Sequence, residues 1–292
     1  VALVQTSIPQ DEKWVTSKVR MIYERLTELT GQAQSDPKVE LIIWPETALP
    51  DDVRNSEHSY ALVWSLCTNG TPILTGSLDT AMLDSGEPRY FNSAFLFDAE
   101  GRIAGEYDKR HLVIFGEFIP FARWIPARWQ AALGLPESIS AGEEGSIFLA
   151  GKGDVPLAPL ICFEDMLAEL ARADVRAGAR LLVNITNDAW YGRTGAPYQF
   201  LAITELRSAE SRLWTARAAN TGISAFIDDR GRTRAATGIF EQAVLVRDVP
   251  LAGHGARPTF YVRHGEWLSG LCWAAAALAL LAAGRRGPRT SP

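Results

Sequence analysis

The sequence predicts an α/β protein with a four-layer α-β-β-α sandwich, and three observations support this prediction. Apolar strand-like runs alternate with segments of helical periodicity. The alternation occurs twice, over residues 1–107 and again over 155–227. Both halves end in a strand that runs into an acidic Gly-Arg turn, at 92–102 and at 220–232. Each half must cover its sheet, so the sheets are expected to stack face to face with helices outside.

The elements of the first half follow from apolar periodicity and turn residues. Strands are predicted at Val1–Thr6, Leu41–Trp44, Pro72–Ser77, Asn92–Phe97 and Arg102–Tyr107, the last two joined by a turn at Gly101. Helices are predicted at Asp11–Gln34, with apolar residues at helical spacing, and at Ser56–Cys67. The second half repeats this plan, with strands at Val155–Cys162 and Leu181–Asn184 and helices at Asp165–Ala177 and roughly Ala196–Ala219.

Composition excludes several classes of protein. The 292 residues are 47% hydrophobic, enough for a large core without disulfides. The formal charge is −5 and the basic residues are dispersed, so we expect no nucleic-acid partner. The three cysteines, Cys67, Cys162 and Cys272, are widely spaced, and the four histidines form no helical pair. We therefore expect no disulfide framework, no metal site and no cofactor.

Three apolar strands end in residues that can carry chemistry. Cys162 ends the run at 155–161 and is followed by a helical pattern, which predicts a strand-to-helix elbow where helix N–H groups favour a thiolate. Glu46 follows the strand that Pro45 stops, and Lys109 lies just past another strand. A thiol, a carboxylate and an ammonium supply a nucleophile, a base and an oxyanion stabiliser. Taken singly, each has a plainer interpretation: a buried thiol, a solvated loop carboxylate and a surface ammonium.

Together these segments resemble the nitrilase superfamily, in the order Trp-Pro-Glu, Tyr-x-Lys-x-His-Leu-Val-x-Phe-Gly-Glu and Ile-Cys-x-Glu. Within that superfamily, the stretches 109–120 and 187–192 and the hydrophobic C-terminal segment resemble the apolipoprotein N-acyltransferases. The resemblance covers nearly the whole chain and implies the nitrilase-like sandwich. It puts a Glu-Lys-Cys triad on Glu46, Lys109 and Cys162, and supporting roles on Glu117, Phe163 and Glu164. Phe163 stands where members of the family often carry Tyr, which keeps a backbone N–H and loses a hydroxyl.

Aromatic residues gather in two places near these motifs. The Pro-punctuated stretch 115–136 includes Phe118 and Trp124, and is either a loop packed on the domain or an arm that enters a lipid interface. Trp190 and Tyr191 follow Asn187-Asp188 and either wall an acyl pocket or form a buried aromatic corner.

The C-terminal part is predicted to reach a membrane. Residues 267–283 contain no charge, with tryptophans at one end and Arg285, Arg286 and Arg289 beyond the other. The sequence thus predicts a catalytic domain at 1–252, a linker at 253–266, a transmembrane helix at 267–284 and a basic cytoplasmic tail at 285–292. A buried C-terminal helix is the alternative. The chain begins at Val1 inside a strand-like segment with no leader pattern, and the resemblance implies membrane helices before this point.

The activity that the resemblance implies is N-acylation of lipoproteins at a bacterial inner membrane, with the catalytic domain in the periplasm. The acyl donor would be a phospholipid, chiefly phosphatidylethanolamine. The acceptor would be the α-amine of a diacylglyceryl-cysteine on an apolipoprotein, reached through a thioester on Cys162. Two alternatives remain open: an amidase of the same superfamily acting on a small amide, and a membrane-anchored module that binds lipoproteins without chemistry.

Overall fold

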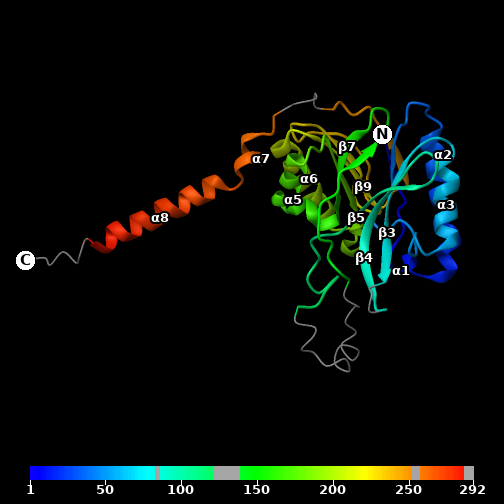
Figure 1. Ribbon diagram of the computed structural model, residues 1–292, viewed down its shortest axis with the longest axis horizontal. Helices are drawn as coiled ribbons and strands as arrows, with labels where there is room; N and C mark the ends of the chain where they lie inside the picture. The colour runs from blue at the N-terminus through cyan, green and yellow to red at the C-terminus, as the bar shows by residue number, and fades with distance from the viewer. Residues whose placement is uncertain (83–85, 121–138, 252–256, 286–292) are drawn as a thin grey trace, which may run out of the picture.

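Two six-stranded mixed sheets form the centre of the molecule (Figure 1). The computed structural model describes residues 1–82, 86–120, 139–251 and 257–285, and the side chains of 283–285 are not described. The first sheet has the strand order β12-β1-β2-β3-β4-β5 and the second has the order β11-β10-β9-β8-β7-β6. The two orders correspond, as expected for two similar halves.

The first sheet consists of β1 (Ala2–Gln5), β2 (Ile42–Ile43), β3 (Ile73–Met82), β4 (Pro88–Phe97), β5 (Ile103–Asp108) and β12 (Ala243–Val246). Strands β1, β2 and β3 are parallel, while β12 and β4 join them antiparallel. Because β5 is antiparallel to β4, it runs in the same direction as β2. The segments that follow β2 and β5 therefore leave the sheet at the same edge.

The second sheet consists of β6 (Phe148–Ala150), β7 (Val155–Ile161), β8 (Leu181–Thr186), β9 (Trp214–Ala219), β10 (Ala225–Ile227) and β11 (Thr233–Ala236). Strands β7, β8 and β9 are parallel and pair in register, so that Leu160, Asn184 and Arg217 lie side by side. The carboxyl ends of parallel strands in α/β sheets are where ligands bind.

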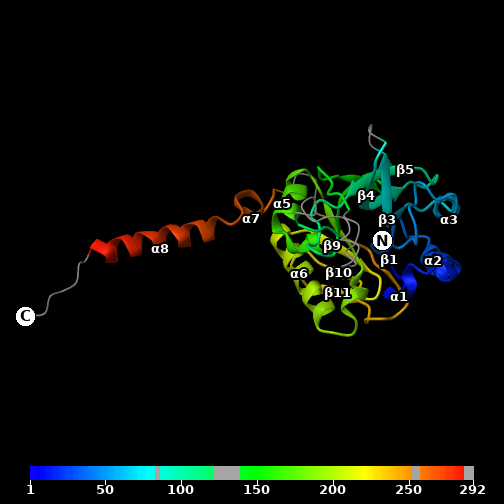
Figure 2. The same cartoon turned by 90° about the horizontal axis from the view of Figure 1, so that it is seen from below.

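Helices cover the outer face of each sheet (Figures 1 and 2). On the first sheet lie α1 (Gln10–Lys13), the 3-10 turn η1 (Thr16–Lys18), α2 (Val19–Gln34) and α3 (Glu57–Cys67). On the second lie α5 (Ala168–Arg176), α6 (Ala196–Ser211) and α7 (Phe260–His264). Two further 3-10 turns, η3 (Cys162–Met166) and η4 (Asp188–Tyr191), follow β7 and β8.

Three apolar cores hold these layers together. One core lies between α2, α3 and the first sheet, and another between α5, α7 and the second sheet. The third core lies between the two sheets, where Leu3, Ile43 and Leu74 of the first belong to one cluster with Leu157, Ile185 and Ala216 of the second. The predicted α-β-β-α order of layers is thereby confirmed.

Several elements differ from the prediction. The helix expected over Asp11–Gln34 is interrupted, with α1 and η1 before α2. The helix expected over Ala196–Ala219 ends at Ser211, because Arg212 takes a left-handed φ of 57° and the chain continues as β9. The strands β6, β11 and β12 and the helix α7 were not predicted. Residues 257–265, expected within a linker, include α7, whose Val262 is fully buried.

The C-terminal helix α8 (Trp267–Arg285) projects away from the sandwich (Figure 1). Its side chains are exposed throughout 267–282. Among the helices of the described ranges, none has both the length and the apolar character needed to cross a membrane. The spanning helix predicted at 267–284 is thus not found: the uncharged run of the sequence is Ala-rich and falls short of the roughly 20 apolar residues that spanning requires. Of the basic tail predicted at 285–292, Arg285 belongs to α8 and residues 286–292 lie outside the described residues.

Candidate active site

Cys162 stands at the turn between a buried strand and a short helix. β7 ends at Ile161, and η3 begins at Cys162 with a backbone φ of +53°. A residue other than glycine rarely adopts this left-handed conformation, and such strained positions cluster at functional sites. The predicted elbow is therefore present, although the helix that follows Cys162 is a 3-10 turn.

Glu46 lies in the loop after β2, and its side chain is held from two sides. Asn92 on β4 donates its amide N–H to Glu46 Oε1 at 2.7 Å, and the backbone N–H of Asn187 donates to Oε2 at 2.7 Å. The loop also rests directly on Gly76 of β3, where an added Cβ would stand 2.6 Å from the Cα of Glu46. The carboxylate is thus fixed by both sheets.

Lys109 follows β5 and is 1% exposed. Its Nζ lies 2.7 Å from Glu117 Oε1 and 3.6 Å from Glu46 Oε1. Glu117 is itself anchored, because the backbone N–H of Val113 donates to its Oε2 at 2.8 Å. One ammonium therefore faces two carboxylates.

A single pocket brings the three predicted triad residues together. Its other lining residues come from both sheets and from the loops at their edge: Gln10, Trp14, Thr47, Leu78, Asn92, Val113, Phe115, Gly116, Glu117, Ile139, Asn187, Trp190 and Tyr191. Asn92, Glu117 and Asn187 add polar groups to the three triad residues. The aromatic lining residues Trp14, Phe115, Trp190 and Tyr191 add apolar surface. Such a mixture suits a substrate with a reactive polar centre and an apolar tail.

The electrostatics of the pocket favour the neutral thiol of Cys162. Burial raises the pKa of the Cys162 thiol well above its usual range, and the nearby Glu46 carboxylate raises it further. Lys109 and the side chain of Thr186 lower this pKa and do not overcome these effects. Burial and Glu46 therefore act against the thiolate that helix N–H groups were expected to favour. A base must take the proton when the thiol reacts.

Two lysines respond differently to the same surroundings. Burial lowers the pKa of Lys109, but Glu46, Cys162 and Glu117 together raise it, and the net result is a pKa above the ordinary value. Burial lowers the pKa of Lys13 to about 8, with Glu46 and Cys162 opposing that change. Lys13 Nζ donates to the backbone carbonyl of Glu46 at 3.2 Å. Lys109 thus stays charged, while Lys13 helps to hold the loop of Glu46 in place through this hydrogen bond.

Glu164 joins the segment after β5 to the Cys162 elbow. It is fully buried and accepts four hydrogen bonds: from the hydroxyl of Tyr107, from the backbone N–H groups of Arg110 and His111, and from the backbone N–H of Ile161, at 2.7 to 3.1 Å. Glu164 therefore fixes the segment that carries Lys109 against the strand end that carries Cys162. Phe163, which lies between Cys162 and Glu164 in the sequence, is partly buried.

The residues expected to bind substrate have different fates. Trp190 and Tyr191, in η4, line the pocket and are 73% and 39% exposed, so they do not form a buried aromatic corner. Phe118 is half-buried and is not among the lining residues, whereas Phe115 is, at 70% exposure. Trp124 lies outside the described residues, as does most of the aromatic stretch at 115–136.

Sequence reasoning missed Gln10, Lys13, Trp14, Asn92 and Asn187 as parts of the site. Gln10, Lys13 and Trp14 lie at or beside α1. Sequence reasoning looked for site residues at the ends of predicted strands, and these three residues do not directly follow one. Asn92 is in the interior of β4, where Asn is uncommon, and that was an available signal. Asn187 belongs to a segment that the resemblance already singled out.

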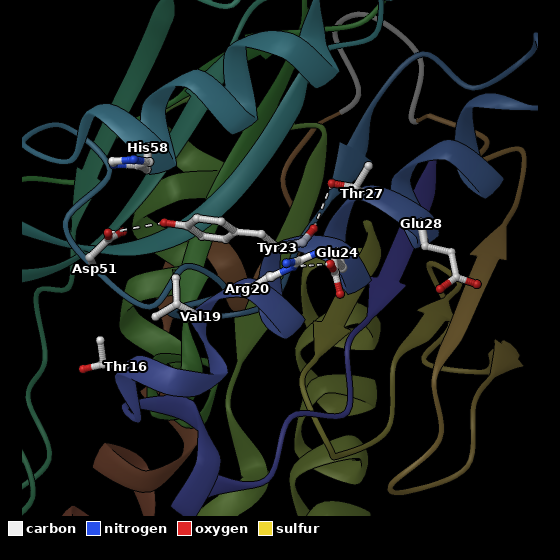
Figure 3. A pocket seen from close by; sticks show the side chains of 9 residues that line it. All are labelled: Thr16, Val19, Arg20, Tyr23, Glu24, Thr27, Glu28, Asp51 and His58. Carbon is white, nitrogen blue, oxygen red and sulfur yellow. Dashed lines mark hydrogen bonds and ion pairs between the residues drawn. The ribbon is translucent and has the colours of Figure 1, made fainter.

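Two other features of the surface lack the combination of cysteine, lysine and glutamate found in the pocket. A hollow beside α2 is lined by nine residues that include no cysteine, with Tyr23 directed at Asp51 and Arg20 paired with Glu24 (Figure 3). The carboxylates of Asp79, Glu106 and Asp108 lie close enough together to hold a cation, but Arg54 already lies 3.0 Å from Asp79 and 2.5 Å from Glu106. Neither feature combines a thiol with a carboxylate and a lysine.

The sequence of the chain agrees with the fold. Residues 1–258 match the family described as carbon-nitrogen hydrolase. The chain belongs to the carbon-nitrogen hydrolase family. The fold of this chain is similar to that of a mutant of the amidase from Nesterenkonia sp. AN1, solved with acrylamide added at its active-site cysteine. The TM-score is 0.64 at 18% identity, and the match covers 93% of this chain and 98% of the amidase.

Curated relatives within the family are similar over nearly the whole chain. Apolipoprotein N-acyltransferase from Geobacter metallireducens is 41% identical over 98% of this chain and 54% of its own length. The enzyme of the same name from Chlorobaculum tepidum is 36% identical, covering 98% and 57% respectively. The chain therefore spans about half the length of the curated relatives it matches.

Proposed function

We propose that the chain is the catalytic part of an N-acyltransferase that moves a fatty acyl chain from a phospholipid to the α-amine of a diacylglyceryl-cysteine on an apolipoprotein. The pocket that holds Cys162, Glu46 and Lys109 beside exposed aromatic side chains carries this proposal. Relatives with this name at 36% and 41% identity support it, and they favour it over hydrolysis of a small amide.

In the first half of the proposed reaction, Cys162 accepts the acyl group. Glu46 removes the proton from Cys162 Sγ as the sulfur attacks the ester carbonyl carbon of the phospholipid. Lys109 Nζ and the backbone N–H of Phe163 stabilise the oxyanion that forms on the carbonyl oxygen. The carbon–oxygen ester bond then breaks, and the departing lysophospholipid oxygen takes the proton back from Glu46. The product is a thioester on Cys162.

In the second half, the thioester passes its acyl group to the amine. The neutral α-amine of the lipoprotein attacks the thioester carbon, and Glu46 takes a proton from the attacking nitrogen. The carbon–sulfur bond breaks, and the proton from Glu46 returns to Cys162 Sγ. Glu117 keeps Lys109 directed at the oxyanion in both halves. This scheme requires no metal or organic cofactor.

Lipid contact is part of the same proposal. Trp14, Phe115 and Trp190 are 46%, 70% and 73% exposed around the pocket, and the apolar surface of α8 is uncovered. Exposed aromatic and apolar side chains that lie together can mark interaction sites, and Trp is favoured at lipid interfaces. We propose that the domain works at the periplasmic face of a bacterial inner membrane, with α8 in contact with lipid and phosphatidylethanolamine as the chief donor.

The proposal is tested by trapping the acyl-enzyme. Full-length protein in detergent is incubated with isotope-labelled phosphatidylethanolamine and no acceptor, and its peptides are analysed by mass spectrometry. We expect a fatty-acyl mass on the peptide that contains Cys162, removed by hydroxylamine and transferred to a diacylglyceryl peptide when that acceptor is added. Cys162→Ala abolishes both results.

Cys67→Ala is the matched control. Cys67 is a buried thiol on α3 whose pKa burial raises to about 12, so its loss leaves acylation unchanged. Label on Cys67 or Cys272 instead of Cys162 would refute the nucleophile assignment. Rapid hydrolysis of short amides without lipid, and no acyl-enzyme from phospholipid, would establish the amidase alternative. Binding of lipoprotein with neither reaction would establish a module without chemistry.

A further inference from the structure

A buried arginine lies behind the pocket. Arg217 on β9 is 1% exposed and lies 3.1 Å from each of two carboxylates, Asp165 in η3 and Asp188 in η4, which are equally buried. Burying three charged groups is unfavourable unless their geometry is well matched. The carboxylates belong to the turns that follow β7 and β8, so this cluster connects the two segments that carry Cys162 and Asn187.

One set of contacts runs from Arg217 to the nucleophile. Its guanidinium donates to Asn184 Oδ1, and the Asn184 amide donates to the backbone carbonyl of Cys162 at 3.3 Å. The same amide donates to the carbonyl of Leu160 at 3.2 Å. These bonds hold the strand end at Leu160 and at Cys162 itself, whose left-handed backbone needs such support.

A second set of contacts runs from Arg217 to the proposed base. Its other guanidinium nitrogen donates to Asp188 Oδ2 at 3.1 Å, and Thr186 donates to Asp188 Oδ1 at 2.9 Å. Asp188 directly follows Asn187, whose backbone N–H holds Glu46 Oε2 at 2.7 Å. A Cβ on Gly222 would overlap Asp188, so this carboxylate also lies in a tightly shaped position.

We propose that Arg217 is a positioning residue that fixes Cys162 and Glu46 relative to each other. The fork of its guanidinium is suited to this task, because it bonds Asn184 and Asp188 at the same time, which the single ammonium of a lysine cannot do with the same geometry. The inference rests on the roles proposed above for Cys162 and Glu46. It does not depend on the identity of the acyl donor.

The test is a double-mutant cycle on thiol reactivity, which requires no lipid. The rate of Cys162 alkylation by iodoacetamide at pH 8 is measured by mass spectrometry in the full-length protein, for Arg217→Lys, Glu46→Gln and the double variant. We expect Arg217→Lys to change the rate when Glu46 is present and to have a smaller effect when Glu46 is absent. The difference should be about threefold or more, as residues of one network show.

Arg207→Lys is the matched control, since Arg207 is another buried arginine, paired with Glu210 at 2.7 Å on α6. It should lower the melting temperature without any coupling to Glu46. Equal fold-changes for Arg217→Lys in both backgrounds, or a lowered melting temperature with an unchanged alkylation rate, would show a merely structural role. If Arg217→Lys does not fold, Asp188→Asn is taken through the same cycle, with the same criterion. A protein that takes no acyl chain from phospholipid still gives this readout, so the two proposals fail separately.

Discussion

Lys109 Nζ lies 2.7 Å from Glu117 Oε1, closer than the 3.6 Å that separates it from Glu46 Oε1. The amide of Asn92 joins the same two carboxylates, at 2.7 Å from Glu46 and 3.2 Å from Glu117. Glu117 therefore supplies the nearer counter-charge that holds the ammonium, and Glu46 is less tightly bound to it. This division is compatible with the proton exchange between Glu46 and Cys162 that we propose.

Glu117→Gln should slow acyl-enzyme formation by weakening the hold on Lys109. The lysine keeps its charge, because Glu46 also raises its pKa, so the loss should be smaller than that for Lys109→Met. Removing an oxyanion stabiliser costs about 100- to 1,000-fold in rate. Single-turnover acylation of Cys162 measures both variants. A loss for Glu117→Gln as large as that for Lys109→Met would mean that Glu117 has a direct chemical role.

Glu46→Gln and Lys109→Met should have opposite effects on the alkylation of Cys162. Glu46 raises the pKa of the thiol and Lys109 lowers it. The first variant should thus react faster with iodoacetamide at pH 8 than the native protein, and the second more slowly. In acyl transfer both should be slow, with a loss of about 100- to 10,000-fold when the general base is missing. Slower alkylation in Glu46→Gln would show that Glu46 does not act on the thiol electrostatically.

The native alkylation rate should rise steadily with pH. Because the pKa of Cys162 lies well above its usual range, the thiolate fraction increases about tenfold for each pH unit between 7 and 9. A plateau below pH 8 would indicate a preformed thiolate and would remove the need for a base. Iodoacetamide alkylation over that range, with Cys162→Ala to subtract other thiols, distinguishes these results.

The sequence contained enough to predict the layers of the fold and the three polar strand ends. Period-two and helical patterns mark buried strands and helices, and the residue types at 46, 109 and 162 carry recognisable chemistry. The positions of β6, β11 and β12 were beyond this reasoning, because these strands are short and lie at or near sheet edges. Their pairing is decided by partners far away in the sequence, as with β12 on β1.

The error at Ala196–Ala219 also concealed Arg217. The segment Trp214–Ala219 is rich in alanine, which favours helix, and its strand conformation depends on pairing with β8 and β10. An arginine in an expected surface helix gives no reason to suspect a buried ion cluster. The same limit applies to the thiol of Cys162. Its elbow can be inferred locally, but its pKa depends on burial and on Glu46, which lies far away in the sequence.

Glu164→Gln should destabilise the fold and disturb the site together. The buried carboxylate accepts from three backbone N–H groups and from Tyr107, and an amide offers one fewer acceptor atom in that place. We expect the free energy of unfolding to fall by about 1–3 kcal/mol, which denaturant titration measures. Glu169→Gln, at an exposed position on α5, is the control and should leave it nearly unchanged. Equal stability of the two variants would contradict the role assigned to Glu164.

Gly76→Ala should displace Glu46 without touching any group that takes part in the chemistry. An added Cβ would stand 2.6 Å from the Cα of Glu46 and 2.6 Å from the backbone nitrogen of Thr47, and both atoms are backbone. The loop must therefore move, and a misplacement of about 1 Å in a reacting group can cost about 100-fold in rate. Single-turnover acylation of Cys162 measures this loss.

Gly31→Ala provides the matched control, because a Cβ on Gly31 in α2 meets no atom within 4 Å. Alanine is favoured over glycine inside a helix by about 1 kcal/mol, so this variant should be slightly more stable and fully active. If Gly76→Ala acylates as fast as Gly31→Ala, the position of Glu46 does not limit the reaction. The close contact between β3 and the Glu46 loop would then serve packing alone.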